Sequence, residues 1–170
     1  MLLRKLVLAS ILLSAAVSPS VSAIKLQRYL ASLRLGDSLK QIEAIYPPSR
    51  DWPQHKEPGG KVDRIRIERG YSKWFPSKVR TVSLGMRRGK LVQLKLIYNK
   101  VHSRAKPLGE LVVDLSLIYG EPRRYRQKYF WWDAKTVLAV YDTPIKTRSG
   151  IELRTSIELM EKRYFEPFRD

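Results

Sequence analysis

Two segments of this 170-residue chain match each other when one is shifted along the sequence by 73 positions. The first runs from Leu35 to Tyr46 and the second from Leu108 to Tyr119, and both begin with Leu-Gly and end with Ile-Tyr. Their apolar residues recur at helical spacing, and prolines follow at positions 47 and 122. A duplicated unit constrains the fold strongly, because both copies are expected to build the same elements.

Each predicted helix precedes three segments with the alternating pattern of strands. These segments are 62–69, 79–86 and 91–98 after the first helix, and 124–132, 136–141 and 151–159 after the second. We therefore predict an α+β fold of two tandem repeats, at about 35–100 and 108–160, each a helix plus three strands. The repeats would form one antiparallel sheet with the helices packed on one face.

Smaller features fit this plan. The sequence Arg87-Arg88-Gly89-Lys90 is typical of a hairpin turn, with Gly supplying the positive φ angle, and Asp133 suits another turn. In the last strand, the alternation predicts Ile151 and Leu153 inward and Glu152 and Glu158 outward. Residues 50–61 and 144–150 are expected to form loops, and the aromatic residues after Glu161 are expected to dock on the domain.

The first 23 residues have the pattern of a cleavable signal peptide. Arg4 and Lys5 precede an apolar stretch of about a dozen residues, shorter than the ~20 needed to cross a bilayer. Small residues end at Ala23, which suits a cleavage site. We therefore predict a periplasmic or secreted protein in which residues 24–170 form a single domain. The alternative is an uncleaved membrane anchor.

Charge and cysteine content narrow the function. The formal net charge of +17 falls to +15 when Arg4 and Lys5 leave with the signal. Such an excess attracts anionic polymers and acidic surfaces, although it also keeps an exported protein soluble. The chain has no cysteine, which excludes disulfides, a thiol nucleophile and a lipidated cysteine, and favours a bacterial source.

Patterns typical of enzymes are missing from the sequence. It has no Gly-x-Ser-x-Gly motif, phosphate-binding glycine loop or His-Glu-x-x-His motif. The two histidines, His55 and His102, fall in predicted loops without acids at ligand spacing, whereas a metal site needs three or four ligands. We predict that the protein is not an enzyme and has no catalytic residue, cofactor or metal site.

The segment 123–132 is the best candidate for a binding surface. Read as one strand, it places Tyr125, Tyr129 and Trp131 on the core face. The opposite, open face would then present a basic and aromatic stripe of Arg124, Arg126, Lys128, Phe130 and Trp132. Cations of this kind bind anionic groups, and exposed rings anchor a protein or stack on sugars or bases. The alternative is that a loop or the tail covers the rings and that the cations are only solvated.

The helix openings also resemble a known envelope family. Gly36-Asp37-Ser38, Ile42, Ile45-Tyr46-Pro47-Pro48 and Tyr119-Gly120-Glu121-Pro122 are similar to the pattern of BamE-type (SmpA/OmlA) outer-membrane assembly proteins and the β-lactamase inhibitory protein. The resemblance implies an exported, non-enzymatic, protein-binding domain. The chain departs from the BamE type in lacking the lipidated cysteine, in having two units and in Tyr46-Pro47, where Leu-Gly is common. No functional residue is carried over from it.

Two functions follow as hypotheses. The first is an exported module of the bacterial cell envelope that binds another envelope protein. The second is a binder of an anionic polymer, such as lipopolysaccharide, an acidic glycan or nucleic acid, through the basic and aromatic face. A hydrolase is a distant third and requires His55 or His102 beside a carboxylate in a cleft.

Sequencing the amino terminus of the exported protein tests the signal peptide. We expect the mature chain to begin at Ile24, because Ala23 ends the small-residue cleavage site. A mature protein that still begins with Met1 or Leu2 contradicts cleavage.

Overall fold

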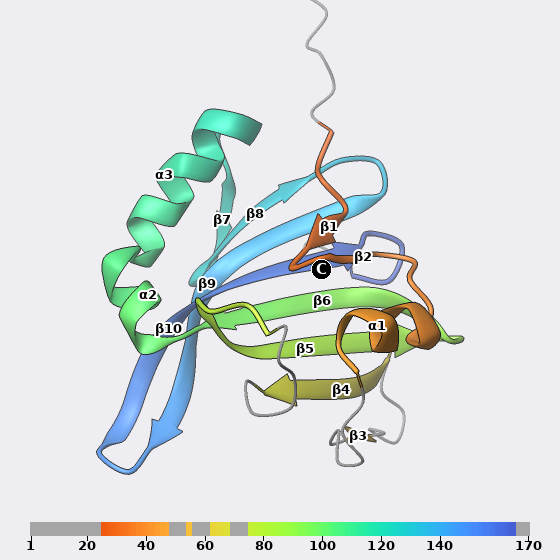
Figure 1. Ribbon diagram of the computed structural model, residues 1–170. Helices are drawn as coiled ribbons and strands as arrows, with labels where there is room; N and C mark the ends of the chain where they lie inside the picture. The colour runs from red at the N-terminus through yellow and green to blue at the C-terminus, as the bar shows by residue number, and fades with distance from the viewer. Residues whose placement is uncertain (1–24, 48–53, 56–61, 69–74, 166–170) are drawn as a thin grey trace, which may run out of the picture.

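The computed structural model describes residues 25–47, 54–55, 62–68 and 75–165; the predicted signal peptide lies outside this part. The main feature is an eight-stranded antiparallel sheet with the order β3-β4-β5-β6-β10-β9-β8-β7 (Figure 1). The strands are β3 (Gln54–His55), β4 (Asp63–Glu68), β5 (Val79–Arg87), β6 (Lys90–Tyr98), β7 (Arg123–Tyr125), β8 (Lys128–Trp132), β9 (Thr136–Thr147) and β10 (Gly150–Glu161).

The two halves of the chain meet at the centre of this sheet. Strands β3 to β6 pair in sequence order, and so do β7 to β10. The halves are joined where β10 pairs with β6, from Ser156 opposite Ile97 to Met160 opposite Gln93. Every pair in this ladder links distant parts of the chain, so the sheet depends on both halves.

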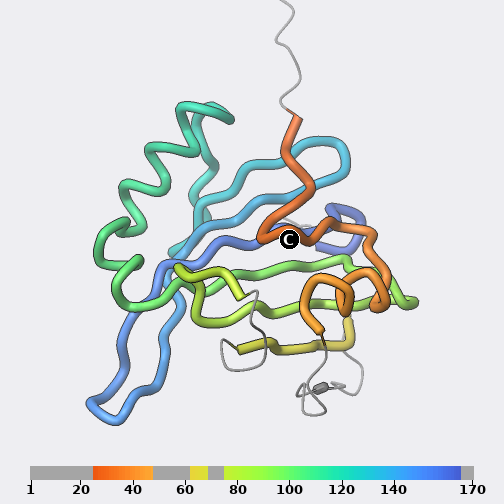
Figure 2. The backbone as a smooth tube through the Cα atoms, viewed as in Figure 1, coloured from red at the N-terminus to blue at the C-terminus, as the bar shows by residue number. Residues whose placement is uncertain are grey.

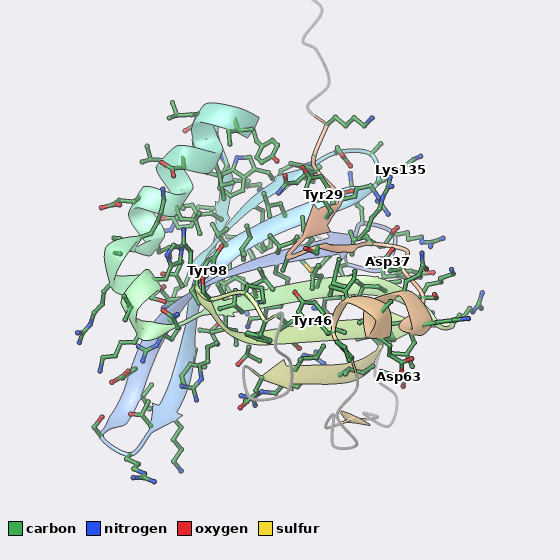
Figure 3. All side chains as sticks on the ribbon, in the orientation of Figure 1. Tyr29, Asp37, Tyr46, Asp63, Tyr98 and Lys135 are labelled. Carbon is green, nitrogen blue, oxygen red and sulfur yellow. The ribbon has the colours of Figure 1, made fainter. Side chains whose placement is uncertain are left out.

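One face of the sheet is covered by the other elements. These are the hairpin of β1 (Tyr29–Leu30) and β2 (Leu33–Arg34), and the helices α1 (Leu39–Ile45), α2 (Lys100–Ala105) and α3 (Leu108–Tyr119). The main hydrophobic core lies under the hairpin, α1 and α3, where Leu33, Ile42 and Leu115 pack against strand residues such as Leu94. Tyr46, just after α1, is buried there, and its hydroxyl donates to the carbonyl oxygen of Ala31 at 2.8 Å (Figure 3). No helix within the described ranges is long and apolar enough to cross a bilayer.

The predicted fold of two helix-plus-three-strand repeats is wrong. Strands dominate the structure, and four of them follow α1 and four follow α3. In the first half, β3 is added within the predicted loop 50–61, most of which lies outside the described residues. In the second half, the segment 124–132 is two strands, β7 and β8, instead of one. Helix α2 and the β1–β2 hairpin were not predicted at all.

The missed hairpins have turns without the usual sequence signals. Ala31 and Ser32 join β1 to β2 with φ angles of 51° and 64°, and Arg126 has a φ of 55° between β7 and β8. Such angles are uncommon for residues other than Gly, Asn and Asp, so neither turn was visible in the sequence. The turn between β5 and β6 was predicted correctly, because Gly89 takes a φ of 71° there.

The end of the β9–β10 hairpin extends beyond the rest of the sheet (Figure 2). Strand β6 pairs with β10 only from Ser156 onward, and β8 pairs with β9 only up to Tyr141. The prediction that Ile151 and Leu153 point into the core is therefore wrong, and their exposed fractions are 75% and 61%. Alternation gives the face of a strand but not whether another layer covers that face.

The first described residues are fastened to the end of the sheet. The backbone N–H of Leu26 donates to Asp133 Oδ2 at 2.9 Å. The guanidinium of Arg28 donates to Thr136 Oγ1 at 3.0 Å and forms an ion pair with Glu161. Asp133 Oδ1 also accepts from the backbone N–H groups of Lys135 and Thr136, which confirms the predicted turn. One carboxylate thus joins the start of the domain to the β8–β9 turn.

Replacing Asp133 with Ala should lower the free energy of unfolding by about 1–3 kcal/mol, because three backbone donors lose their acceptor. Burial acts to raise the pKa of Asp133, but the three hydrogen bonds and the charge of Arg28 outweigh it, so the pKa is lowered. The stabilisation is therefore complete above the unfolded-state pKa of about 3.9 and is lost as the pH falls through the folded-state value.

Urea unfolding across this pH range measures the effect. The control is Asp63→Ala, at an exposed residue of β4 (Figure 3), which should change stability by less than about 0.5 kcal/mol. Equal losses for the two variants, or a loss for Asp133→Ala that does not shrink in acid, would contradict the role assigned to Asp133.

Candidate binding pocket on the open sheet face

The face of the sheet opposite the helices carries a second, smaller apolar cluster. It consists of Phe130, Val137, Ala139, Tyr141 and Met160, with Phe165 from the tail packed against it. Beside this cluster lies an open pocket with a volume of about 800 Å³. The pocket is lined by Arg64, Gln93, Lys95, Tyr125, Arg126, Gln127, Lys128, Phe130, Tyr141, Glu158, Met160 and Phe165. Its walls therefore come from both halves of the chain.

Glu158 is the acidic residue in this lining, and its exposed fraction is only 5%. The hydroxyl of Tyr141 donates to its Oε2 at 2.7 Å, and the amide of Gln93 donates to its Oε1 at 2.5 Å. Lys95 stands directly opposite Glu158 in the pairing of β6 with β10. A buried carboxylate needs such partners, because an unpaired buried charge is strongly destabilising.

Gly85 makes room for this arrangement. It lies opposite Gln93 in the pairing of β5 with β6. A Cβ atom at Gly85 would lie 2.8 Å from both Cβ and Oε1 of Gln93, which is too close for either atom to stay in place. The absence of a side chain at this position therefore allows Gln93 to reach Glu158.

Two lysines share the ring of Tyr141. The Nζ atoms of Lys128 and Lys95 lie 4.0 Å and 4.6 Å from its centroid, within the range of cation–π contacts. Burial lowers the pKa of Lys95; Glu158 acts to raise it, and the charges of Lys128 and Arg64 lower it further. Burial, followed by the charge and hydrogen bond of Glu158, raises the pKa of Tyr141, so its hydroxyl remains a donor. Positive charge thus gathers around one aromatic ring.

The predicted surface residues do not all share this face. Lys128, Phe130 and Trp132 do, because they alternate along β8, but Phe130 is buried and Trp132 lies outside the pocket lining. Arg126 occupies the turn before β8 and lines the pocket. Arg124 is opposite Tyr129 in the β7–β8 pair and therefore lies on the helix-covered face, 5.6 Å above the Tyr129 ring.

This outcome follows from the turn in the middle of the predicted strand. In an antiparallel pair, residues directly opposite each other share a face. Arg123 stands opposite Phe130 and Tyr125 opposite Lys128, so the odd-numbered residues of β7 join the even-numbered residues of β8. Phe165, from the tail, lines the pocket, so the predicted docking of the tail is confirmed for this residue. The residues after Phe165 lie outside the described part.

Sequence reasoning missed Arg64, Gln93, Lys95, Tyr141 and Glu158. Glu158 was expected to face solvent, and the structure instead buries it beneath the pocket. These residues are far apart in the sequence, and only the strand order brings them together. The visible signal in the sequence was Glu158 itself, an acidic residue within the apolar run Ile157 to Met160. This signal does not show which side chains would bind the carboxylate.

The pocket has the chemistry of a binding site. Its described lining combines four cationic side chains, one partnered carboxylate and four aromatic rings.

Among the residues that the structure describes, no group of three or more His, Asp or Glu side chains could hold a metal ion. His102 lies on α2 instead of a loop, and its ring packs edge-on against Tyr98 with the centroids 4.5 Å apart. His55 lies in β3, and its side chain is outside the description.

Comparison with known proteins does not assign this site. No protein-family model, no curated protein and no solved structure matches the chain.

The substitution Lys128→Gln should raise the pKa of Lys95, because it removes one of the charges that lower it. Nuclear magnetic resonance of the lysine side chains during a pH titration measures this pKa. The control Lys146→Gln removes one exposed cation on β9 outside the pocket lining and should leave the pKa of Lys95 unchanged. A pKa of Lys95 that stays constant or falls in Lys128→Gln contradicts the coupling.

Proposed function

We propose that this protein is an exported, non-enzymatic binding module of the bacterial cell envelope, and that it holds another envelope protein on the open face of its sheet. Export is proposed from the signal-like residues 1–23. The observation that most supports binding is the pocket, in which cationic and aromatic side chains from five strands and the tail surround one hollow.

The distribution of apolar groups supports this face as the contact surface. The opposite face is already covered by α1, α3 and the β1–β2 hairpin, which pack into the main core. On the open face, Tyr125 and Trp132 have exposed fractions of 43% and 38%. Aromatic and arginine side chains beside a hollow are typical of the residues that contribute most to protein interfaces. The resemblance of the two helix openings to envelope proteins agrees with a protein partner.

A second candidate is an anionic polymer such as lipopolysaccharide, an acidic glycan or nucleic acid. The observation that favours it is the excess of Arg64, Lys95, Arg126 and Lys128 over Glu158 in the lining. Binding of this kind weakens steeply as salt rises, because it releases counterions. A protein interface with apolar contacts depends less on salt.

Crosslinking in cells of the native host tests the first candidate. Gln127, on the pocket rim, is replaced by photoreactive benzoylphenylalanine, and in a separate strain Lys40, which is exposed on α1, is replaced in the same way. We expect a discrete crosslinked protein with the probe at position 127 and not at position 40, because only the open face contacts the partner.

The two candidates give different results. A discrete protein adduct that persists when the cells are washed at high salt supports a protein partner. Loss of all adducts, together with retention on heparin that disappears at moderate salt, supports the anionic polymer. Equal crosslinking at both positions, or no specific partner under any salt condition, contradicts a protein-binding role for this face.

A further inference from the structure

The pocket contains more positive charge than its own carboxylate can balance. Glu158 already accepts hydrogen bonds from Tyr141 and Gln93, and Lys95 lies opposite it in the ladder. Both Lys95 and Lys128 lie against the Tyr141 ring, so the two positive charges are held near each other and repel. An anionic group placed beside these ammonium groups would offset their mutual repulsion. The pocket is therefore complementary to negative charge.

The same carboxylate restricts the kind of anion. A polymer with a charge on every unit would bring some of its charges close to Glu158, where like charges repel. A polypeptide has isolated carboxylates separated by N–H groups and apolar atoms. Its carboxylates can approach Lys95 and Lys128 while its N–H groups approach Glu158. The mixed charge of the pocket therefore favours an acidic peptide over a uniformly charged polymer.

The aromatic walls point in the same direction. Phe165 packs against the apolar cluster that contains Phe130, and both line the hollow; Tyr125, also in the lining, stands opposite Lys128 on the neighbouring strand. Apolar or aromatic side chains of a peptide would be removed from water against these rings. The volume of about 800 Å³ lies within the range of ordinary ligand sites and exceeds what a single small anion needs.

We infer that the pocket receives an acidic segment of the protein partner, with carboxylates beside Lys95 and Lys128 and an apolar side chain against Phe130 and Phe165. This inference rests on the proposed function. It adds that the partner's contacting segment combines acidic and apolar residues, and that the two lysines select it.

Selection from a displayed library of twelve-residue random peptides tests the inference. The bait is the full chain at physiological salt, with heparin added to half of the selections. We expect enriched peptides to contain several Asp or Glu residues and at least one aromatic or large apolar residue. Synthetic versions with Asn and Gln in place of the acids should bind at least about tenfold more weakly, because the charge pairs with the lysines are lost.

Matched variants locate the binding. Lys95→Gln with Lys128→Gln should weaken binding of the selected peptides by about tenfold or more. Lys146→Gln with Arg148→Gln removes the same charge from the β9–β10 hairpin, outside the lining, and should change binding by less than about twofold. The methyl resonance of Met160 in the pocket should shift on peptide binding in the parent chain, and thermal unfolding verifies that all variants are folded.

Two results would overturn the inference. One is a set of enriched peptides without acidic residues, or peptides that bind the pocket variant as well as the hairpin variant. The other is heparin binding that needs Lys95 and Lys128 and excludes every peptide, which would make the pocket a site for an anionic polymer. If the crosslinking probe at position 127 still captures a discrete protein, the proposed function stands, and only the inference that the partner presents an acidic segment is wrong.

Discussion

The pairing of β6 with β10 is the constraint on which the rest of the structure depends. It joins two meanders, β3 to β6 and β7 to β10, into one sheet through the five residue pairs from Ser156–Ile97 to Met160–Gln93. On one side of this ladder, Leu94, Leu96, Ile157 and Leu159 enter the main core. Without the ladder, each meander would expose a long strand edge and half of a core.

The same ladder creates the pocket on its other side. It sets Lys95 opposite Glu158 and brings Gln93 within hydrogen-bond distance of that carboxylate. The next strand, β9, adds the donor hydroxyl of Tyr141, and β8 adds Lys128. Each of these groups is a long side chain on a neighbouring strand, so their distances are set by the spacing of the sheet. A pocket built on paired strands is held more rigidly than one on a loop.

The sequence predicted individual elements better than their arrangement. The helices at α1 and α3 were visible from apolar spacing, and Ser38 caps α1 with a side chain that accepts from the backbone N–H of Gln41. The β5–β6 turn was visible through Gly89. The β7–β8 turn was not, because Arg126 and Gln127 are not turn-forming residues, and this error moved Arg124 to the wrong face.

For the site, the sequence identified Arg126, Lys128 and Phe130 but none of the groups across from them. The partners of Lys128 are decided by which strands become neighbours, and local periodicity contains no information on that order. Burial was equally hidden: Glu158 alternates like an outward residue, and only the surrounding strands show that it is enclosed. The prediction for Ile151 was wrong in the opposite sense: the residue was expected to be buried and is exposed. The reason is that β6 does not pair with the part of β10 that contains Ile151.

The fastening of the first residues to the end of the sheet has a consequence for the order in which the molecule assembles. The backbone N–H of Leu26 and the guanidinium of Arg28 bind Asp133, Thr136 and Glu161, more than a hundred residues later in the chain. The β1–β2 segment therefore cannot reach its final position until the last strand exists. Contacts of such high sequence separation slow folding, because the entropy of closing the long loop is lost before the contacts form. Residues that precede the whole sheet in the sequence are thus among the last to be fixed in place.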